Sequence, residues 1–212
     1  MTRYDVIVVG LGAMGSAALY QLAKRGAKVL GVDRFSPPHD QGSSHGDTRI
    51  TRLAIGEGAH YTPLVKRSHE IWRELEKETG SDLLTQCGEL IISSENRKSS
   101  VHVEAFFGNT VKAARDHSIA HELLDASQIR SRFPQFNIRD EEFGYFEPEA
   151  GFVRPEACVA AQLSLAEKQG AEIRRGETVF VFGTTPNGVT VKTDRGFYQT
   201  DRLILAAGAW LP

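Results

Sequence analysis

Residues 6–15, Val6-Ile7-Val8-Val9-Gly10-Leu11-Gly12-Ala13-Met14-Gly15, decide the fold of this chain. Four β-branched residues without a polar interruption predict a central parallel strand that is buried on both faces. The Gly-x-Gly-x-x-Gly spacing predicts a tight turn into a helix that packs close to the strand. The N–H groups at the start of that helix can then face a phosphate.

A second apolar run, residues 28–32, ends in Asp33, eighteen residues after Gly15. A carboxylate at the tip of a second strand can accept hydrogen bonds from both ribose hydroxyls, and it repels a 2′-phosphate. Between the strands, Met14, Ala17, Ala18 and Leu22 recur at helical spacing, which predicts a helix. The stretch therefore predicts a dinucleotide-binding strand-helix-strand unit, which serves both NAD and FAD.

The C-terminal end favours FAD. Residues 200–210 form an apolar strand that ends in Ala207-Gly208-Ala209-Trp210. This pattern resembles the second flavin-contacting motif of FAD-dependent oxidoreductases, in which a strand ends in Ala-x-Gly beside the dinucleotide. The alternative is a buried strand that ends in an ordinary glycine turn.

Residues 42–52, Gly-Ser-Ser-His-Gly-Asp-Thr-Arg-Ile-Thr-Arg, combine glycines, hydroxyls, an imidazole and two guanidinium groups. Arg49 and Arg52 are three residues apart, which on a helical turn places them on one face. Two such cations can bind a carboxylate and stabilise an anionic reduced flavin. The alternative is a solvated basic loop that pairs with Asp47 or Glu57.

With these residues the chain resembles the monomeric sarcosine oxidase and N-methyltryptophan oxidase group of FAD-dependent amine oxidases. The resemblance implies oxidative demethylation of a secondary amino acid, with hydride transfer to flavin N5, hydrolysis of the imine, and reoxidation by oxygen to give hydrogen peroxide. The matching segments are residues 4–15, Pro37-Pro38-His39, Gly46–Arg52, Gly56-Glu57-Gly58, Tyr61–Leu64, Phe146-Glu147-Pro148 and Gly208-Ala209-Trp210.

The resemblance also implies roles for individual residues. It places Arg52 on the substrate carboxylate, Arg49 beside the flavin ring and His45 in the same site. Ser44 stands where close relatives are expected to have the first of two histidines. The residues expected to contact FAD are Gly10, Gly12, Ala13, Met14, Gly15, Asp33, Arg34, Gly42, Ser43, Thr48, Arg49, Val179, Ala207, Gly208 and Trp210.

The expected fold class is α/β, with a Rossmann-like FAD-binding domain that is interrupted by part of an α+β substrate domain. We expect residues 1–82 and 151–212 to form the FAD-binding domain and residues 83–150 the partial substrate domain. Helices are predicted over 61–79, 101–117, 126–132 and 155–169, and a hairpin at Pro186-Asn187-Gly188.

Family members are longer than this chain, which is therefore expected to be an amino-terminal fragment. By resemblance, the missing half holds a lysine linked to oxygen activation and the cysteine that carries the flavin covalently. Neither Cys87 nor Cys158 matches that cysteine, and both are expected to be buried free thiols. Two alternatives stay open: a flavin oxidoreductase acting on glycine, pipecolate or a D-amino acid, and a non-catalytic FAD-binding fragment.

The amino-acid composition limits the kinds of binding partner that we expect. Lys and Arg number 25 and Asp and Glu 27, for a net charge of −2, so no basic surface for nucleic acid or anionic membrane is expected. The seven histidines show no metal-ligand spacing, and no apolar stretch is long enough to span a bilayer. We expect a cytoplasmic protein, monomeric at full length, whose partners are an amino-acid substrate and oxygen.

Overall fold

The computed structural model describes residues 2–94 and 104–211. The chain forms two compact units. The first contains residues 1–49, 75–83 and 154–212, and the second contains residues 50–74 and 84–153. Each unit has its own sheets and core, so each is described separately.

The first unit is built on a six-stranded mixed sheet with the strand order β10-β11-β12-β1-β2-β9. β1 pairs in parallel with both β12 and β2, and β2 pairs in parallel with β9. β10 and β11 extend the sheet as an antiparallel hairpin. The strands are β1 (Arg3–Val9), β2 (Val29–Asp33), β9 (Glu172–Arg175), β10 (Val179–Thr185), β11 (Gly188–Thr193) and β12 (Phe197–Leu205). The α/β fold class and the hairpin at 186–188 are thereby confirmed.

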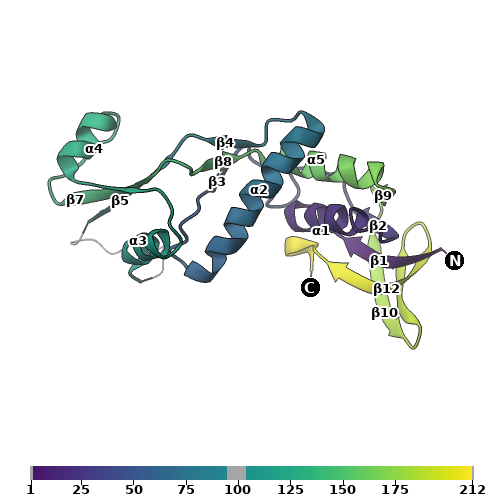
Figure 1. The fold of residues 1–212 in the computed structure, drawn as a ribbon. Coiled ribbons are helices and arrows are strands. Elements are labelled where there is room, and N and C mark those ends of the chain that lie inside the picture. The colour runs from purple at the N-terminus through teal and green to yellow at the C-terminus, as the bar shows by residue number, and fades with distance from the viewer. Residues whose placement is uncertain (1, 95–103, 212) are drawn as a thin grey trace. The chain divides into compact units, whose positions relative to one another are not determined.

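Two helices of this unit, α1 (Ala13–Ala23) and α5 (Pro155–Lys168), pack against each other (Figure 1). The buried hydroxyl of Ser16 donates to the side-chain oxygen of Gln162 at 2.7 Å and joins the two helices. The apolar residues whose spacing predicts α1 are not its buried face. Met14 is 78% exposed, whereas Leu19 and Tyr20 are buried. Because most of α1 is apolar, its periodicity alone does not select one face.

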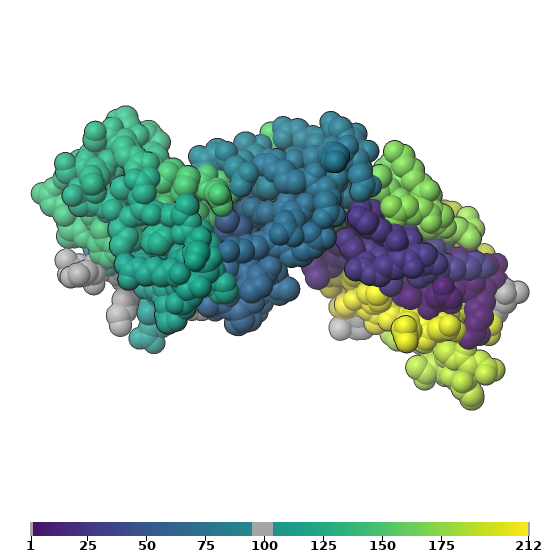
Figure 2. Space-filling view, in the orientation of Figure 1, coloured from purple at the N-terminus to yellow at the C-terminus, as the bar shows by residue number. Residues whose placement is uncertain are grey.

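The core of the first unit contains Tyr4, Ile7, Leu30, Val32 and Val191. The hairpin of β10 and β11 projects from the rest of this unit (yellow-green in Figure 2). Phe180 and Phe182 of β10 are exposed. Val179, Val189 and Val191 of this hairpin therefore contribute to the core, whereas the two phenylalanines do not.

The second unit contains two small sheets, with strand orders β3-β8-β4 and β5-β7-β6. Their strands are β3 (Arg49–Thr51), β4 (Leu84–Gln86), β5 (Glu89–Ser94), β6 (Glu122–Leu124), β7 (Glu142–Glu147) and β8 (Gly151–Val153). The helices are the 3₁₀ turn η1 (Ala59–Tyr61), α2 (Thr62–Thr79), α3 (Phe106–Asp116) and α4 (Ala126–Arg132). The last residues of α2, 75–79, belong to the first unit. Of the helix predicted over 101–117, residues 101–103 lie outside the described residues.

Residues 50–74 belong to the second unit, although they were expected in the dinucleotide domain. Leu53 and Ala54 pack in one core cluster with Val111, Ala114 and Tyr145. In addition, the Lys66 ammonium group donates to the His117 carbonyl at 2.7 Å. These contacts explain why the two compact units divide differently from the expected domains.

The two cysteines differ in environment. Cys158 is buried in α5, and burial raises the pKa of its thiol to about 12. Cys87 is exposed, so the prediction that it is buried was wrong. It lies in the turn between β4 and β5. No helix in the described part of the chain is both long and apolar enough to cross a membrane.

His69 on α2 gives the second unit a predicted pH dependence. Its Nε2 lies 2.9 Å from Thr51 Oγ1, and desolvation by burial lowers its pKa. The unfolded chain therefore binds the proton more readily. We expect the stability that neutral His69 contributes to be complete above about pH 6.5 and to be lost as the pH falls towards the lowered pKa.

Urea unfolding between pH 5 and pH 7.5 measures this dependence. The variant His69→Gln keeps a hydrogen-bonding partner for Thr51 and should flatten the slope of unfolding free energy against pH. The matched variant His60→Gln changes an exposed histidine and should leave the slope as in wild type. An unchanged slope in His69→Gln contradicts the prediction.

Candidate dinucleotide-binding site

The glycine-rich turn between β1 and α1 requires glycine at two positions. Gly10 has φ +87°, and a Cβ there would lie 2.6 Å from the Ala206 carbonyl oxygen. A Cβ at Gly15 would lie 1.7 Å from the Gly10 carbonyl oxygen. The close approach predicted between α1 and β1 is therefore present, and the helix N-terminus lies directly beyond the strand.

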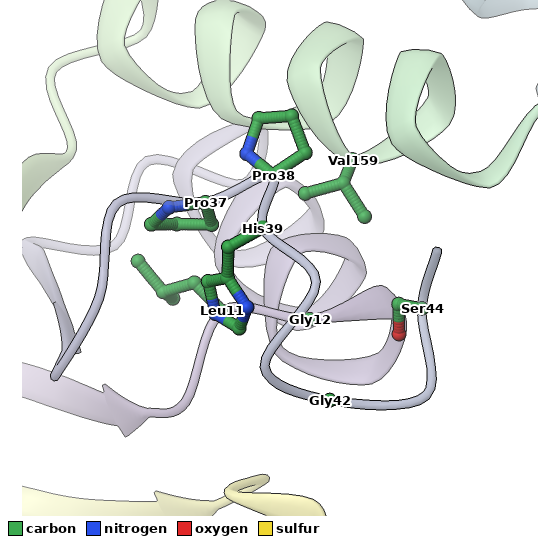
Figure 3. A pocket seen from close by; sticks show the side chains of 8 residues that line it. All are labelled: Leu11, Gly12, Pro37, Pro38, His39, Gly42, Ser44 and Val159. Carbon is green, nitrogen blue, oxygen red and sulfur yellow. The ribbon is translucent and has the colours of Figure 1, made fainter. Parts of the chain in front are cut away.

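The first N–H group of α1 already has an acceptor. α1 begins after Gly12, which offers no side-chain cap. Instead the Ala13 N–H donates to the hydroxyl of Ser44 at 3.0 Å. Figure 3 shows Ser44 beside the start of α1. Ser44 and Val159 are among the residues that line a small cavity of about 30 Å³ there. Ser44 is thus part of this site, although it was not among the residues expected to contact FAD.

Asp33 lies at the tip of β2, as predicted, and is buried. One of its oxygens accepts from the Leu11 N–H at 2.7 Å, and the other accepts from the Phe35 N–H at 2.8 Å. His39 Nε2 lies 3.4 Å from the latter oxygen. A carboxylate has about four acceptor positions, so Asp33 can shape the glycine turn and still accept from a ribose hydroxyl.

The C-terminal motif contacts the segment that follows β2. The Trp210 indole N–H donates to the Gln41 carbonyl at 2.9 Å. The Arg34 guanidinium lies 5.2 Å from the centre of the Trp210 ring, which is within the range of a cation–π contact. Gln41 and Trp210, 169 positions apart in the sequence, thus border one space.

That space is a cavity of about 1140 Å³, open to solvent and lined only by residues of the first unit. It exceeds the roughly 300–1,000 Å³ typical of small-ligand pockets, as an extended dinucleotide requires. Gly15, His45, Thr48 and Arg49 are not among its lining residues. The expected FAD contacts that do line it are Gly10, Gly12, Ala13, Met14, Asp33, Arg34, Gly42, Ser43, Val179, Ala207, Gly208 and Trp210.

These features fit FAD. The glycine turn and the helix N-terminus can bind a pyrophosphate, and the carboxylate at the end of the second strand can bind a ribose. The exposed thioether of Met14 and the aromatic ring of Phe180 line the same cavity and offer apolar surface to the ring systems. In the described residues no group of three or more His, Cys, Asp or Glu is arranged to hold a metal ion.

The Arg49 side chain forms hydrogen bonds with the backbone of its own loop. Its guanidinium donates to the carbonyls of Thr48 at 2.8 Å and Ser43 at 3.0 Å, and also to the carbonyl of His45. The expectation of a helical turn from Arg49 to Arg52 was wrong, because Arg49–Thr51 is strand β3. Pairing of β3 with β8 keeps this segment extended.

Arg52 belongs to the second unit and is bordered by two carboxylates. Its Nη2 donates to both oxygens of Glu57, at 2.6 and 2.8 Å, while Nη1 lies 4.0 Å from Glu89. The guanidinium also lies 5.4 Å from the centre of the Phe106 ring. Its side chain is 19% exposed, and Nε is buried without a hydrogen-bond partner. The Arg52 side chain is therefore held in place, and its Nε can still donate a hydrogen bond.

Glu89 beside it was not singled out by the sequence. Burial raises the pKa of its carboxyl group, and the neighbouring Arg52 opposes that shift. One of its oxygens is buried without a hydrogen-bond partner. Nothing in the local sequence distinguishes this glutamate from a solvated strand residue, so only its tertiary position identifies it.

The chain belongs to the FAD-dependent oxidoreductase family DAO, whose model matches residues 5–212. FAD is the cofactor of this family. Monomeric sarcosine oxidase from Bacillus sp. strain B-0618 is 44% identical over 209 residues, which are 99% of this chain and 52% of that protein. N-methyl-L-tryptophan oxidase from Salmonella arizonae is 35% identical over 99% of this chain and 54% of its own length.

Among solved structures, the Tyr258Phe mutant of NikD, described as an unusual amino acid oxidase, has a TM-score of 0.86 and 30% identity over 99% of this chain and 52% of that chain. L-proline dehydrogenase from P. horikoshii has a TM-score of 0.83 at 22% identity and supports the fold alone. The chain spans about half the length of the curated relatives that it matches.

Proposed function

We propose that this protein is an FAD-dependent oxidase of secondary amino acids, with sarcosine or another N-methyl amino acid as substrate. The similarity to sarcosine oxidase and N-methyl-L-tryptophan oxidase supports the reaction class. The observation that carries the substrate class is Arg52, a restrained guanidinium with an unpartnered Nε. We further propose a cytoplasmic monomer, since the Bacillus relative is named monomeric and both cysteines here are free.

In this reaction the amine loses two electrons and two protons to give an imine. Water hydrolyses the imine to an amino acid and an aldehyde, and oxygen accepts the two electrons and two protons as hydrogen peroxide. FAD supplies the two-electron acceptor between amine and oxygen. Gly10, Gly12 and Ala13 would hold its pyrophosphate and Asp33 its ribose.

Arg52 would bind the substrate carboxylate. A guanidinium suits this role because its planar donors match the two carboxylate oxygens and it stays charged throughout the working pH range. Phe106 packs on its face, and Glu57 fixes Nη2, so little side-chain freedom is lost on binding. His45 and Arg49 would border the reacting end of the substrate and the flavin ring.

Visible absorption under anaerobic conditions tests the function. The flavin band should bleach when sarcosine or N-methyltryptophan is added. A band that persists with both and bleaches with glycine, pipecolate or a D-amino acid establishes the first alternative. A protein that binds no FAD or is not reduced by any of these substrates establishes a non-catalytic chain.

Arg52→Ala tests the carboxylate assignment. We expect the KM for the N-methyl amino acid to rise about 10- to 100-fold, which corresponds to the loss of charge-assisted hydrogen bonds. Oxidation of an analogue without a carboxylate, N-methylbenzylamine, should change little. Arg67→Ala removes an exposed arginine of the same unit and is the matched control. An unchanged KM in Arg52→Ala contradicts the assignment.

A further inference from the structure

The loop that carries Arg49 contains a turn with two successive left-handed residues. Gly46 has φ +106° and Asp47 has φ +64°. Asp47 is therefore in a conformation that few non-glycine residues adopt. Successive N–H groups in such turns point to one side and form a concave anion-binding surface. An acceptor on that side would stabilise the turn.

The acceptor is Glu156, 110 residues further along the chain. Its carboxylate oxygen accepts from the Gly46 N–H at 2.6 Å. The hydrogen bond from Gly46 is the main cause that lowers the pKa of the Glu156 carboxyl group, and the Asp47 N–H lowers it further. Glu156 is consequently a carboxylate at neutral pH, and its hydrogen bonds are charge-assisted.

Glu156 lies on a well-supported element. It is in the first turn of α5, directly after Pro155, which is buried. The hydrogen bond between Gln162 and Ser16 fixes α5 to α1, the helix that follows the glycine turn. Glu156 thereby ties the turn to the framework that also forms the pyrophosphate end of the site.

The shape of the turn determines where Arg49 lies. Because Arg49 donates to the carbonyls of Ser43, His45 and Thr48, its guanidinium follows the backbone of residues 43–48. A Cβ at Gly46 would lie 3.2 Å from Arg49 Nη1, so the guanidinium packs directly on the turn. A change in the turn therefore displaces Arg49.

We propose that Glu156 is a positioning residue for the flavin end of the site. Glu156 holds the Gly46–Asp47 turn and, through this turn, Thr48 and Arg49. The proposal rests on the FAD assignment. Glu156 itself does not line the dinucleotide cavity. It acts through the loop, and the adenosine end, bordered by Asp33 and Val179, does not depend on it.

Titration with two ligands tests this role. FAD requires both ends of the site, whereas ADP uses only the adenosine and pyrophosphate end. Glu156→Ala should raise the Kd for FAD about tenfold, as expected from the loss of one to two charge-assisted hydrogen bonds, and leave the Kd for ADP within twofold of wild type. Glu156→Gln keeps an oxygen acceptor and should restore most of the FAD affinity. Glu167→Gln, near the other end of α5, is the matched control and should bind both ligands as wild type does.

Thermal unfolding of each variant separates positioning from folding. A Tm close to that of wild type, with selective loss of FAD affinity, supports the proposal. Unchanged FAD affinity in Glu156→Ala overturns it, as does a parallel loss of FAD and ADP affinity. A wild-type protein that binds ADP but not FAD contradicts the cofactor assignment, which is a different failure.

Discussion

Gly15→Ala is expected to destabilise the first unit by about 3 kcal/mol or more and to abolish FAD binding. The added Cβ would lie 1.7 Å from the Gly10 carbonyl oxygen, a backbone atom that cannot rotate away. α1 must therefore move from β1, and the N–H groups at its start move with it. Urea unfolding and FAD fluorescence titration measure the two effects.

Gly183→Ala is the control for this substitution. Gly183 lies in β10 of the same unit, and a Cβ there would meet no atom within 4 Å. We expect its unfolding free energy to stay within about 0.5 kcal/mol of the wild-type value, or to increase. If Gly15→Ala unfolds at the wild-type urea concentration, the packing of α1 on β1 is not as tight as described.

Glu147→Ala is expected to cost the second unit about 3–5 kcal/mol. Glu147 is 0% exposed, and its carboxylate accepts from the N–H groups of Leu53 at 2.6 Å and Ala54 at 3.1 Å. It also accepts from the buried Tyr145 hydroxyl at 2.7 Å. Burial, followed by the Glu147 hydrogen bond, raises the pKa of Tyr145, which therefore stays a neutral donor. Alanine leaves all three donors buried without an acceptor.

Glu147→Gln should have an intermediate effect, because one oxygen acceptor remains. Glu141→Ala changes an exposed glutamate of the same unit and should be nearly neutral. Chemical denaturation followed by circular dichroism compares the three variants. Since Leu53 and Ala54 directly follow Arg52, the same substitution should also weaken the binding of carboxylated substrates. Equal stabilities of Glu147→Ala and Glu141→Ala would show that the carboxylate is dispensable.

The sequence predicted the parts of the fold that depend on local pattern. The glycine turn, Asp33 at the tip of β2, the hairpin at 186–188 and the family follow from residues close together in the chain. Helix α4 was predicted to the residue, with Pro134 as its stop signal, and in the structure Asp125 caps its start. Each of these features has a short-range physical cause.

The features that the sequence missed depend on distant contacts. The helical turn expected at Arg49 is a strand because β8, about a hundred residues away, pairs with it. Glu156 is an ordinary glutamate in the sequence, and Glu147 stands out there only as part of a segment that matches the family. Their acceptance of N–H groups from residues 46–54 appears only in the fold. Cys87 is exposed in the turn between β4 and β5. No local periodicity reports such contacts.

The pairing of β1 with β12 has a consequence for synthesis in the cell. The fingerprint strand leaves the ribosome before its neighbour on one side, Phe197–Leu205, which is made almost two hundred residues later. Until then β1 has an open edge on that side, and translation at roughly 5–20 residues per second keeps it open for about 10–40 seconds. The nascent chain therefore carries an apolar, unpaired edge strand, a state that invites aggregation. We therefore expect a chaperone to protect the nascent chain during this interval. We expect the dinucleotide to bind only after β12 has paired with β1.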